Sequence, residues 1–367
     1  MSTLRVIFAG GGTGGHLFPA IAIAEEIKKQ VPDATILFIG TKDKIEARVV
    51  PQKGFQFETI WISGFQRGLR IKNFIFPLKV VISLMQAYSI IKYFQPDVVI
   101  GTGGYVSGPV LRAAILARIP TLIHEQNSYP GVTTRLLAPK VNEVHLTFES
   151  SKRYFHDFKN IYVTGNPTRE DLESAAREEA LAYFGFEASE HKAIVLIFGG
   201  SLGAHSINEA VENCLDKLIN NNVRLIWQTG KEDYEHVIVA AKKLSPKMVW
   251  VSPFIDRMDY AYCASDLVVC RAGATTIAEI TRLGKPAILV PYPHAAANHQ
   301  FENAKSLVDA GAAEMLNDSE INDKLFTTIL NTLTPERLSY MGEQSKKLGK
   351  PDASKILAQR IINLART

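Results

Sequence analysis

Cysteine is scarce in this chain: only Cys214, Cys263 and Cys270 stand among 367 residues. They form no Cys-x-x-Cys pair, and an odd number cannot be paired completely within one chain. We therefore expect buried free thiols and a reducing, cytoplasmic environment. Metal ligands are also poorly represented, because no Asp-x-Asp motif occurs and His294 and His299 lack a carboxylate at ligand spacing. We expect neither a bound metal nor a cofactor.

Long apolar runs are missing as well. No stretch of about 18 apolar residues is free of charge, and a membrane-spanning helix requires such a stretch. Residues 1–5 lead at once into a short strand and glycines, so we expect no signal peptide. Hydrophobic residues make up 46% of the chain and charged residues 21%, which is enough apolar surface for a buried core. The length predicts two domains.

Acidic residues are few in the first half of the chain. Residues 1–165 carry 19 Lys and Arg against 11 Asp and Glu, a net charge of +8. Residues 166–367 carry 22 against 26, a net charge of −4. This asymmetry predicts an anionic partner for the first half. The chain has no aromatic-plus-basic RNA signature, zinc-finger spacing or basic heptad region, so we expect no nucleic acid and consider an acidic membrane face instead.

Apolar strand-like segments alternate with helical patterns along the chain. Most of these segments are continuous, as in parallel strands covered on both faces, and the alternation predicts a doubly wound α/β fold with right-handed crossovers. We expect strands at residues 4–9, 34–39, 57–61, 97–101, 120–125, 143–147 and 161–164, and again at 193–198, 224–228, 248–251, 266–270 and 287–291. Helices are expected at residues 19–29, 204–219 and 275–283, among others.

The two halves of the chain resemble each other. Residues 8–16, FAGGGTGGH, are echoed by residues 198–205, FGGSLGAH, and residues 97–104, DVVIGTGG, by residues 266–273, DLVVCRAG. Two echoes in the same order predict two Rossmann-like domains facing a cleft, residues 1–165 and 166–349, with a linker near residues 165–167. A last amphipathic helix, at about residues 353–364, should cross back to the first domain, so that residues 350–367 pack on it.

The first glycine loop, residues 10–16, follows a strand and precedes a helix, so its N–H groups can bind an anion at the positive helix end. Its glycines fit the dinucleotide pattern Gly-x-Gly-x-x-Gly. However, the second strand ends in Ile-Gly-Thr without the acidic residue that would hold a ribose. A tight structural turn is an alternative. We favour an oxygen-rich substrate with phosphate near this loop.

Two residues near the predicted strand ends are candidates for acid–base chemistry. His16 stands where the first glycine loop enters its helix, and an imidazole can accept a proton at neutral pH. A structural role for His16 is the alternative. Glu125, within HEQN at residues 124–127, ends a strand at the edge where open α/β sheets bind ligands. It is either a second base or an acceptor that orients its loop, and we favour the second role.

The second half offers further anion- and sugar-binding groups. Residues 199–203, GGSLG, combine backbone N–H groups, the Ser201 hydroxyl and a helix N-terminus. Arg169, after GNPT, is placed to reach a diphosphate. A third glycine turn, RAGATTIAE at residues 271–279, ends in Glu279, which suits a ribose diol or simply favours the start of a helix. Residues 298–300, Asn-His-Gln, offer groups for sugar hydroxyls.

One segment mixes bulky apolar residues with cations. Within residues 65–79 these are Phe74, Ile75, Phe76 and Leu78 beside Arg67, Arg70, Lys72 and Lys79. The mixture suits an interfacial contact with anionic lipid. An ordinary helix packed on the sheet with a solvated basic edge is the alternative.

Six motifs in this order resemble the MurG family of N-acetylglucosaminyltransferases: GGTGGH at residues 11–16, GGYVSGP at 103–109, HEQN at 124–127, GNP at 165–167, GGSLGA at 199–204 and RAGATT at 271–276. The match covers essentially the whole chain. It implies a GT-B fold and metal-independent, inverting transfer of N-acetylglucosamine from UDP-N-acetylglucosamine to lipid I, which yields lipid II of bacterial peptidoglycan.

The resemblance also assigns residues to the substrates. Donor contacts fall on Thr13, Gly14, Gly15, Asn127, Arg169, Ser201, Ile255, Ala274, Thr275, Thr276, Ile277, Ala278, Glu279 and Gln300, with the Ile255 backbone reading the uracil. His16 takes the proton of the muramoyl C4 hydroxyl. Gly103, Gly104, Tyr105 and Glu125 are candidates on the acceptor side. His299 stands where some relatives have a second Gln.

The partners that the resemblance implies are UDP-N-acetylglucosamine, lipid I (undecaprenyl-diphosphate-muramoyl-pentapeptide), an anionic phospholipid surface and other cell-wall synthesis proteins. It places the protein peripherally on the cytoplasmic face of the inner membrane. Alternatives with the same fold plan are a UDP-N-acetylglucosamine 2-epimerase, a diacylglycerol glycosyltransferase and a non-catalytic nucleotide-sugar-binding protein. An epimerase would need no lipid-facing basic patch, and a binding module would need no base at His16.

Overall fold

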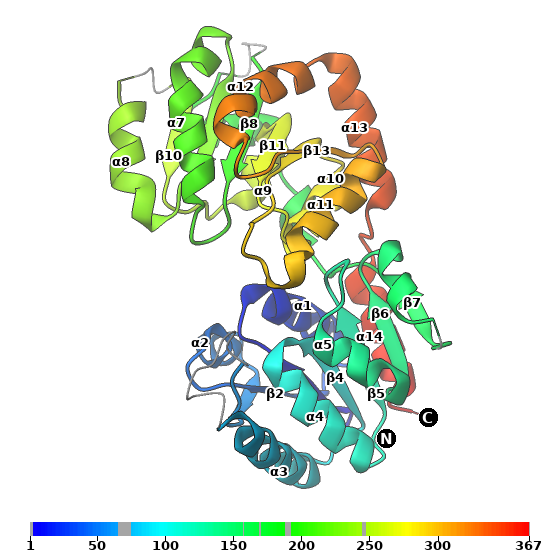
Figure 1. Cartoon of the computed structure of the whole chain (residues 1–367). Coiled ribbons are helices and arrows are strands. Elements are labelled where there is room, and N and C mark those ends of the chain that lie inside the picture. Colours follow the sequence, from blue (N-terminus) through cyan, green and yellow to red (C-terminus); the bar gives the residue numbers. More distant parts are fainter. Residues whose placement is uncertain are drawn as a thin grey trace. The chain divides into compact units, whose positions relative to one another are not determined.

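The computed structural model describes residues 3–64, 75–156, 158–168, 170–187, 192–243 and 247–366. The chain divides into two compact units. The first unit contains Met1–Thr168 and Lys350–Thr367, and the second contains Arg169–Gly349. Figure 1 shows that each unit is built from a sheet with helices packed around it.

The first unit holds a seven-stranded parallel sheet in the order β3-β2-β1-β4-β5-β6-β7. Its strands are β1 (Arg5–Gly10), β2 (Thr35–Gly40), β3 (Gln56–Thr59), β4 (Val98–Gly103), β5 (Thr121–Glu125), β6 (Glu143–Leu146) and β7 (Ile161–Val163). Its α-helices are α1 (Gly14–Gln30), α2 (Ile45–Gln52), α3 (Phe76–Phe94), α4 (Gly104–Leu116), α5 (Val132–Leu137) and α14 (Ala353–Leu364). Short 3₁₀ turns lie at Ala138–Lys140 and Glu149–Tyr154.

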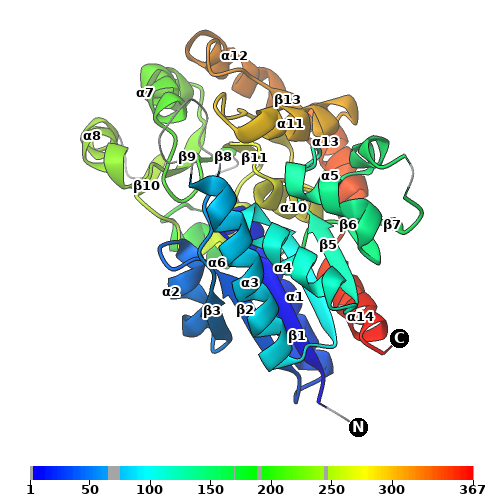
Figure 2. The ribbon, with the colours of Figure 1, turned by 60° about the horizontal axis from the view of Figure 1, so that its bottom comes forward.

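Both faces of this sheet are buried, which explains why its strands read as continuous apolar runs. Successive side chains of β1 point to opposite faces. Ile7 and Ala9 belong to the core formed with α3 and α4, whereas Val6 and Phe8 belong to the core formed with α1 and α14. Figure 2 shows α3 and α4 together on one face of the sheet.

The second unit holds a six-stranded parallel sheet in the order β10-β9-β8-β11-β12-β13. Its strands are β8 (Ile194–Phe198), β9 (Arg224–Gln228), β10 (Val249–Ser252), β11 (Leu267–Cys270), β12 (Ala287–Leu289) and β13 (Ala313–Met315). Its α-helices are α6 (Arg177–Tyr183), α7 (His205–Asn220), α8 (Lys231–Ala241), α9 (Met258–Ala264), α10 (Ala274–Leu283), α11 (His299–Asp309), α12 (Ile321–Thr332) and α13 (Pro335–Leu348). Short 3₁₀ turns lie at Glu170–Glu173 and Ala296–Asn298.

The two sheets share one plan. In each, the first strand of the unit lies in the middle, the next two strands extend to one side and the later strands to the other. The strand order therefore reverses between β1 and β4, and again between β8 and β11. Ligands of open α/β sheets bind outside the carboxyl ends of the strands at such switch points. The expected pair of Rossmann-like doubly wound folds is confirmed.

The C-terminal helix packs on the first unit, as expected. Leu357, Ala358 and Ile361 of α14 are buried against α1. At the other side of the helix, the guanidinium of Arg360 donates to the carboxylate of Glu143 in β6, at 2.5 and 3.1 Å. The chain thus leaves the first unit after Thr168 and returns to it at Lys350.

Several expected boundaries differ from the observed ones. Helix α1 begins at Gly14 rather than at residue 19, so His16 lies inside its first turn. Strand β3 ends at Thr59 instead of residue 61, and β13 was not expected at all. Of the apolar and basic segment at residues 65–79, residues 65–74 lie outside the described part of the chain, and α3 begins at Phe76.

No helix in the part of the chain that the structure describes is long and apolar enough to cross a membrane. All three cysteines are free thiols. Cys214 and Cys270 are buried, but Cys263 is partly exposed, so the expectation of three buried thiols is wrong for Cys263.

Candidate active site

Three strand ends of the first unit meet around His16. The loop after β1 leads into α1, whose N-cap is Thr13 and whose first residues are Gly14 and Gly15. The first N–H groups of a helix have no partner within it and therefore suit an anion. The register between β1 and β4 shifts after Ala9, so that Gly10 pairs with Gly103.

The turn after β4 needs glycine because it lies against the imidazole of His16. Gly103 has φ +107°, and a Cβ atom there would stand 2.6 Å from Nδ1 of His16. The next residue, Gly104, has φ +78°, and its Cβ would stand 2.4 Å from the backbone oxygen of Gly11. Both positions combine a left-handed backbone with a close approach, which only glycine tolerates. The first glycine loop, after β1, and the glycine turn after β4 are therefore packed together.

His16 is connected to the interior of the unit by a chain of hydrogen bonds. Its Nδ1 lies 2.8 Å from Oε1 of Gln126, just after β5. Nε2 of Gln126 lies 2.9 Å from Nδ1 of His124 and donates to the His124 backbone oxygen at 3.0 Å. Nε2 of His124 lies 3.0 Å from the backbone oxygen of Gly165. Burial lowers the pKa of His124 to about 4, so this ring is neutral at pH 7.

The carboxylate of Glu125 accepts hydrogen bonds from the loop that follows it. Its Oε1 accepts the backbone N–H of Asn127 at 3.1 Å, and its Oε2 accepts the N–H of Gly131 at 3.0 Å. The hydroxyl of Thr134 also donates to Oε2, at 2.7 Å. The side chain is buried. These contacts favour the loop-orienting role over that of a second base.

An exposed aromatic ring follows Gly103 and Gly104, the two glycines that the resemblance places on the acceptor side. Tyr105, in the first turn of α4, packs against the backbone of Gly64, where an added Cβ would stand 2.1 Å from the Tyr105 ring. More than half of the Tyr105 side chain is nevertheless exposed. The structure therefore brings Gly103, Gly104 and Tyr105 together with His16 and Glu125 at one edge of the sheet.

In the second unit, the loop after β8 crosses the loop after β9. Gly203 has φ +82°, and a Cβ there would stand 2.0 Å from the backbone oxygen of Thr229. The N–H of Gly203 donates to the oxygen of Gly200 at 3.0 Å, so this amide closes the turn instead of facing a phosphate. Ser201 and Leu202 lie between them and are exposed. Of the loop predicted to bind an anion, residues 199–203, the N–H of Gly203 is therefore already used within the protein.

Gln228, at the end of β9, joins two of the predicted binding segments. Its amide nitrogen donates to the backbone oxygen of Gly200 at 2.8 Å, and its Oε1 accepts the backbone N–H of Ile255 at 2.8 Å. Because that N–H is used within the protein, the predicted contact of the Ile255 backbone with uracil would have to use its carbonyl oxygen. Gln228 was not expected from the sequence, since a lone buried glutamine gives no motif.

The predicted ribose contact is held by a buried tyrosine. Residues Ala274–Glu279 form the first turns of α10, after the N-cap Gly273. The hydroxyl of Tyr262, from α9, donates to Oε2 of Glu279 at 2.9 Å. Tyr262 is completely buried, and burial together with the charge of Glu279 raises its pKa well above the usual value. Tyr262 therefore stays protonated and keeps donating to Glu279.

The remaining groups of the second unit that were predicted to contact the donor already make some hydrogen bonds within the protein. Oε1 of Gln300, in the first turn of α11, accepts the backbone N–H of Tyr292 at 2.9 Å, which leaves its NH₂ group for a sugar hydroxyl. Arg271 donates to Asp318, Ser206 and the backbone oxygen of Val290, so it ties three segments together. Arg169 lies outside the described residues.

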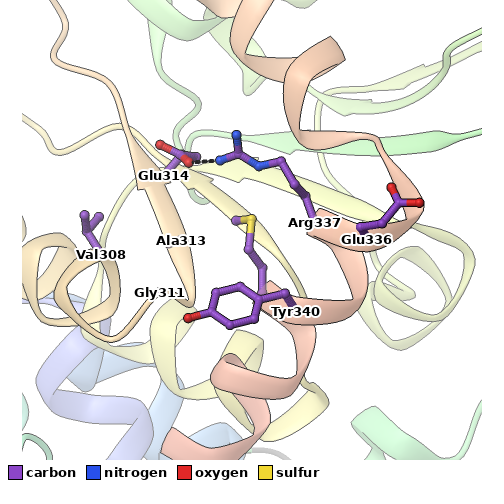
Figure 3. A pocket seen from close by; sticks show the side chains of 8 residues that line it. Val308, Gly311, Ala313, Glu314, Glu336, Arg337 and Tyr340 are labelled. Atoms are coloured by element: carbon purple, nitrogen blue, oxygen red, sulfur yellow. Dashed lines mark hydrogen bonds and ion pairs between the residues drawn. The ribbon is translucent and has the colours of Figure 1, made fainter.

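A pocket of about 470 Å³ lies elsewhere in the second unit (Figure 3). Its lining includes Val308 of α11, Gly311 and Ala313 at the amino end of β13, and Tyr340 of α13. Arg337 and Glu314 form an ion pair at its edge. The glycine loops stand at the carboxyl ends of the strands instead. This pocket is therefore separate from the predicted donor-binding residues.

The residues predicted from the sequence thus fall into two groups, one in each unit, both at carboxyl strand ends. Buried polar groups behind them were not predicted as supports, although the HEQN motif contains two of them: Gln126 and His124 behind His16, Glu46 behind the first glycine loop, and Gln228 and Tyr262 in the second unit. Among the described residues, no group of three or more His, Cys, Asp or Glu side chains is arranged to hold a metal ion.

Comparison with known families gives one consistent match. The glycosyltransferase family 28 N-terminal domain matches residues 6–146, and the glycosyltransferase family 28 C-terminal domain matches residues 194–357. A protein of Chlorobaculum parvum is 47% identical over 99% of this chain and 100% of its own length. It is named UDP-N-acetylglucosamine--N-acetylmuramyl-(pentapeptide) pyrophosphoryl-undecaprenol N-acetylglucosamine transferase. A protein of Halothermothrix orenii with the same name is 43% identical.

Solved structures agree with this match. The crystal structure of MurG from Acinetobacter baumannii superposes with a TM-score of 0.80 at 30% identity, covering 98% of this chain and 99% of that one. UDP-GlcNAc 2-epimerase from Neisseria meningitidis superposes with a TM-score of 0.65, but at 15% identity. The second likeness shows a shared fold alone.

Proposed function

The chain belongs to glycosyltransferase family 28, within its MurG group, and we propose that it transfers N-acetylglucosamine from UDP-N-acetylglucosamine to the C4 hydroxyl of lipid I. It is a GT-B hexosyltransferase of peptidoglycan synthesis. The observation that carries the proposal is the gathering of His16, Gly103 and Gln126 at one strand edge in a chain 47% identical to such a transferase.

The second unit supplies groups suited to the nucleotide part of the donor. The carboxylate of Glu279 is oriented by Tyr262, and a carboxylate accepts both hydroxyls of a ribose. The carbonyl oxygen of Ile255 can accept the N3–H of uracil. The exposed Ser201 loop and the start of α7 offer N–H groups and a positive helix end to the diphosphate. We assign Ala274–Ala278 and Gln300 to the same donor.

The first unit supplies the base. In the proposed reaction the acceptor C4 oxygen forms a bond to the anomeric carbon while the bond from that carbon to the UDP oxygen breaks, so the configuration inverts. His16 takes the proton that the C4 hydroxyl loses. The buried carboxylate of Glu125 shapes the loop that carries Asn127, which we place beside the donor sugar. We place Thr13, Gly14 and Gly15 near the donor and Gly103, Gly104 and Tyr105 near the acceptor diphosphate.

The leaving UDP carries negative charge that must be stabilised as the bond breaks. The N–H groups at Ser201 and Leu202 and the N-terminus of α7 are the described groups that suit this role. The sequence after GNPT also supplies Arg169, which we include in the proposal as a diphosphate contact. Preorganised donors of this kind cost little reorganisation during the reaction.

We also propose that α3 meets an anionic phospholipid surface, on the cytoplasmic face of the membrane that holds lipid I. Leu78, Val81 and Met85 follow a helical spacing and are exposed, Met85 by 67%. Ala87 and Ile91, on the other side of the helix, are buried. Neither α3 nor the neighbouring α4 contains a carboxylate, while Lys79, Lys92 and Arg112 add positive charge. Within these two helices the apolar face is accompanied by cations alone, which suits an interfacial helix.

The transfer assay tests the proposed function. Purified protein is incubated with radiolabelled UDP-N-acetylglucosamine, with and without lipid I, and the lipid fraction is separated. We expect labelled lipid II only when lipid I is present, together with release of UDP. An epimerase would instead convert the free donor without acceptor, and a binding module would leave both substrates unchanged. Either of these results would overturn the proposal.

A further inference from the structure

We propose that Gln126 and His124 are positioning residues that hold the neutral His16 ring in one tautomer, with the proton on Nδ1 and the lone pair on Nε2. The inference deepens the proposed function, since it concerns the residue assigned as the base. It rests on four contacts within the first unit, none of which involves a substrate.

The direction of each hydrogen bond follows from two backbone carbonyls. A carbonyl oxygen only accepts, so the Gly165 oxygen, 3.0 Å from Nε2 of His124, requires a proton on that nitrogen. The His124 carbonyl, 3.0 Å from the Gln126 amide, requires the NH₂ end of that amide on its side. These two requirements fix the tautomer of the His124 ring and the orientation of the Gln126 amide independently.

The hydrogen bonds from Gly165 through His124 and Gln126 to His16 form a relay, and its remaining donors and acceptors then have one consistent assignment. Burial holds the pKa of His124 at about 4, with the nearby His145 and His16 acting in the same direction, so the ring is neutral at pH 7. With its proton on Nε2, it accepts from Gln126 through Nδ1, at 2.9 Å. The Gln126 oxygen is therefore turned to His16, 2.8 Å away, and can only accept. His16 must donate through Nδ1.

This assignment has a chemical consequence for catalysis. A neutral imidazole carries one proton, so a proton on Nδ1 leaves Nε2 as the basic nitrogen. When Nε2 takes the acceptor proton, Nδ1 still donates to Gln126 and no group of the relay has to move. The partner is a neutral amide rather than a carboxylate, so the relay orients the ring without a negative charge that would hold the added proton.

The relay is also shielded from competing partners. Gln126 and His124 are each 1% exposed, so water cannot easily replace either bond. An amide flip of Gln126 would place its oxygen against the carbonyl oxygen of His124, now 3.0 Å from the amide nitrogen. This contact between two acceptors would be repulsive. The hydrogen bonds from Gly165 to His16 therefore have one stable arrangement of donors and acceptors.

The test that does not depend on activity is the imidazole spectrum of the protein without substrates. The full chain is labelled with ¹⁵N-histidine, and long-range ¹H–¹⁵N correlations are recorded near pH 8, with the His16→Gln variant assigning the His16 signals. We expect a protonated Nδ1 and an unprotonated Nε2 for His16. An Nε2–H pattern, or an average of the two tautomers as in free histidine, would overturn the proposal.

A double-mutant cycle tests whether the relay acts through His16. Gln126→Met keeps the size of the side chain but removes the amide, and we expect kcat to fall by roughly 10- to 10³-fold while the KM for UDP-N-acetylglucosamine stays within a few-fold. In the His16→Ala background the same substitution should have almost no further effect on kcat. An equal loss in both backgrounds would mean that Gln126 serves the fold, which would overturn the positioning role.

The two tests separate this proposal from the proposed function. If His16 shows the Nδ1–H tautomer but the protein makes no lipid II, the relay stands and the assigned reaction fails. If lipid II forms but the His16 ring shows the other tautomer, the reaction stands and the relay fails. The spectrum of the wild-type protein gives this answer even if Gln126→Met does not fold.

Discussion

The carboxylate of Glu46 lies directly behind the first glycine loop, with its Oε2 accepting the backbone N–H of Gly12 at 3.0 Å. Its Oε1 accepts the N–H and the hydroxyl of Thr41, at 3.1 and 2.8 Å, so one side chain of α2 joins the ends of β1 and β2. Glu46 is 1% exposed. A carboxylate therefore does lie near the end of the second strand. Its hydrogen bonds, however, are made to Gly12 and Thr41 of the protein, so its presence does not indicate a ribose site.

Glu46→Ala should therefore destabilise the first unit and disturb the loop. Glu46 accepts from three partly buried donors, and a buried donor left without an acceptor costs about 1–3 kcal/mol. Taking the lower end for each, we expect a loss of about 3 kcal/mol in the free energy of unfolding. Urea denaturation followed by circular dichroism measures this. Glu58→Ala, at an exposed position of β3, is the matched control and should change stability by less than about 0.5 kcal/mol. Equal effects at the two positions would contradict the role given to Glu46.

Glu279→Ala should raise the KM for UDP-N-acetylglucosamine and change kcat by only a few-fold. The reason is that a ribose contact remote from the reacting bond is made equally in the ground state and the transition state. Tyr262→Phe removes the hydroxyl that orients Glu279, so its KM should rise less than that of Glu279→Ala. Steady-state kinetics at saturating lipid I give these numbers. An unchanged KM in Glu279→Ala would remove the ribose assignment.

The buried His124 should make the first unit less stable in mild acid. Its pKa is lowered from 6.5 to about 4 by burial, so between these pH values the unfolded chain binds a proton that the folded one does not. The free energy of unfolding should therefore fall as pH drops from 6.5 to 4, by up to about 3 kcal/mol. Above pH 6.5 neither state binds this proton and the contribution is flat.

The comparison that isolates this effect uses His124→Asn, which cannot titrate. The stability advantage of the wild type over the variant should shrink as pH falls from 7 to 4, and thermal melts across this range measure it. His145, whose pKa burial lowers in the same direction, is present in both proteins, so most of its own contribution is removed by the comparison. Two parallel stability curves would show that His124 is not buried in its neutral form.

Charges placed on the exposed face of α3 should weaken membrane binding. Burial of one such side chain in the interface contributes about 1.5 kcal/mol, so the double change Val81→Asp with Met85→Asp should lower binding to phosphatidylglycerol vesicles on the order of 100-fold. Val239→Asp, at an exposed position of α8 in the second unit, is the control. High salt should weaken but not abolish wild-type binding. If the double variant sediments with vesicles like the control, α3 is not the membrane contact.

Much of the fold could be predicted because local sequence patterns mark its strands and turns. Continuous apolar runs such as Ile194–Phe198 identify strands buried on both faces, and the paired glycine motifs identify the two switch points. Strand β13 was missed because it has three residues, one of them Glu314, and no apolar run marks it. The start of α1 was missed because Gly14 and Gly15 are poor helix formers whose place is set by the β1–β4 packing.

The site was predictable only in its outer layer. Residues such as His16 and Glu279 stand in glycine motifs whose chemistry can be recognised from the sequence. Their supports are less visible: Gln126 stands in the HEQN motif and Tyr262 in no motif, and the role of each depends on a contact with a residue 110 or 17 positions away in the chain. Such pairings are created by the topology of the sheet, and no local pattern carries them.

The most direct test of the proposed mechanism is the turnover of His16→Ala with UDP-N-acetylglucosamine and lipid I, measured beside the affinity for UDP by calorimetry. If His16 takes the acceptor proton, kcat should fall by on the order of 10²–10⁴ while the Kd for UDP stays within a few-fold of wild type. A kcat within a few-fold of wild type would contradict the assignment of His16 as the base and, with it, the role of the hydrogen bonds behind it.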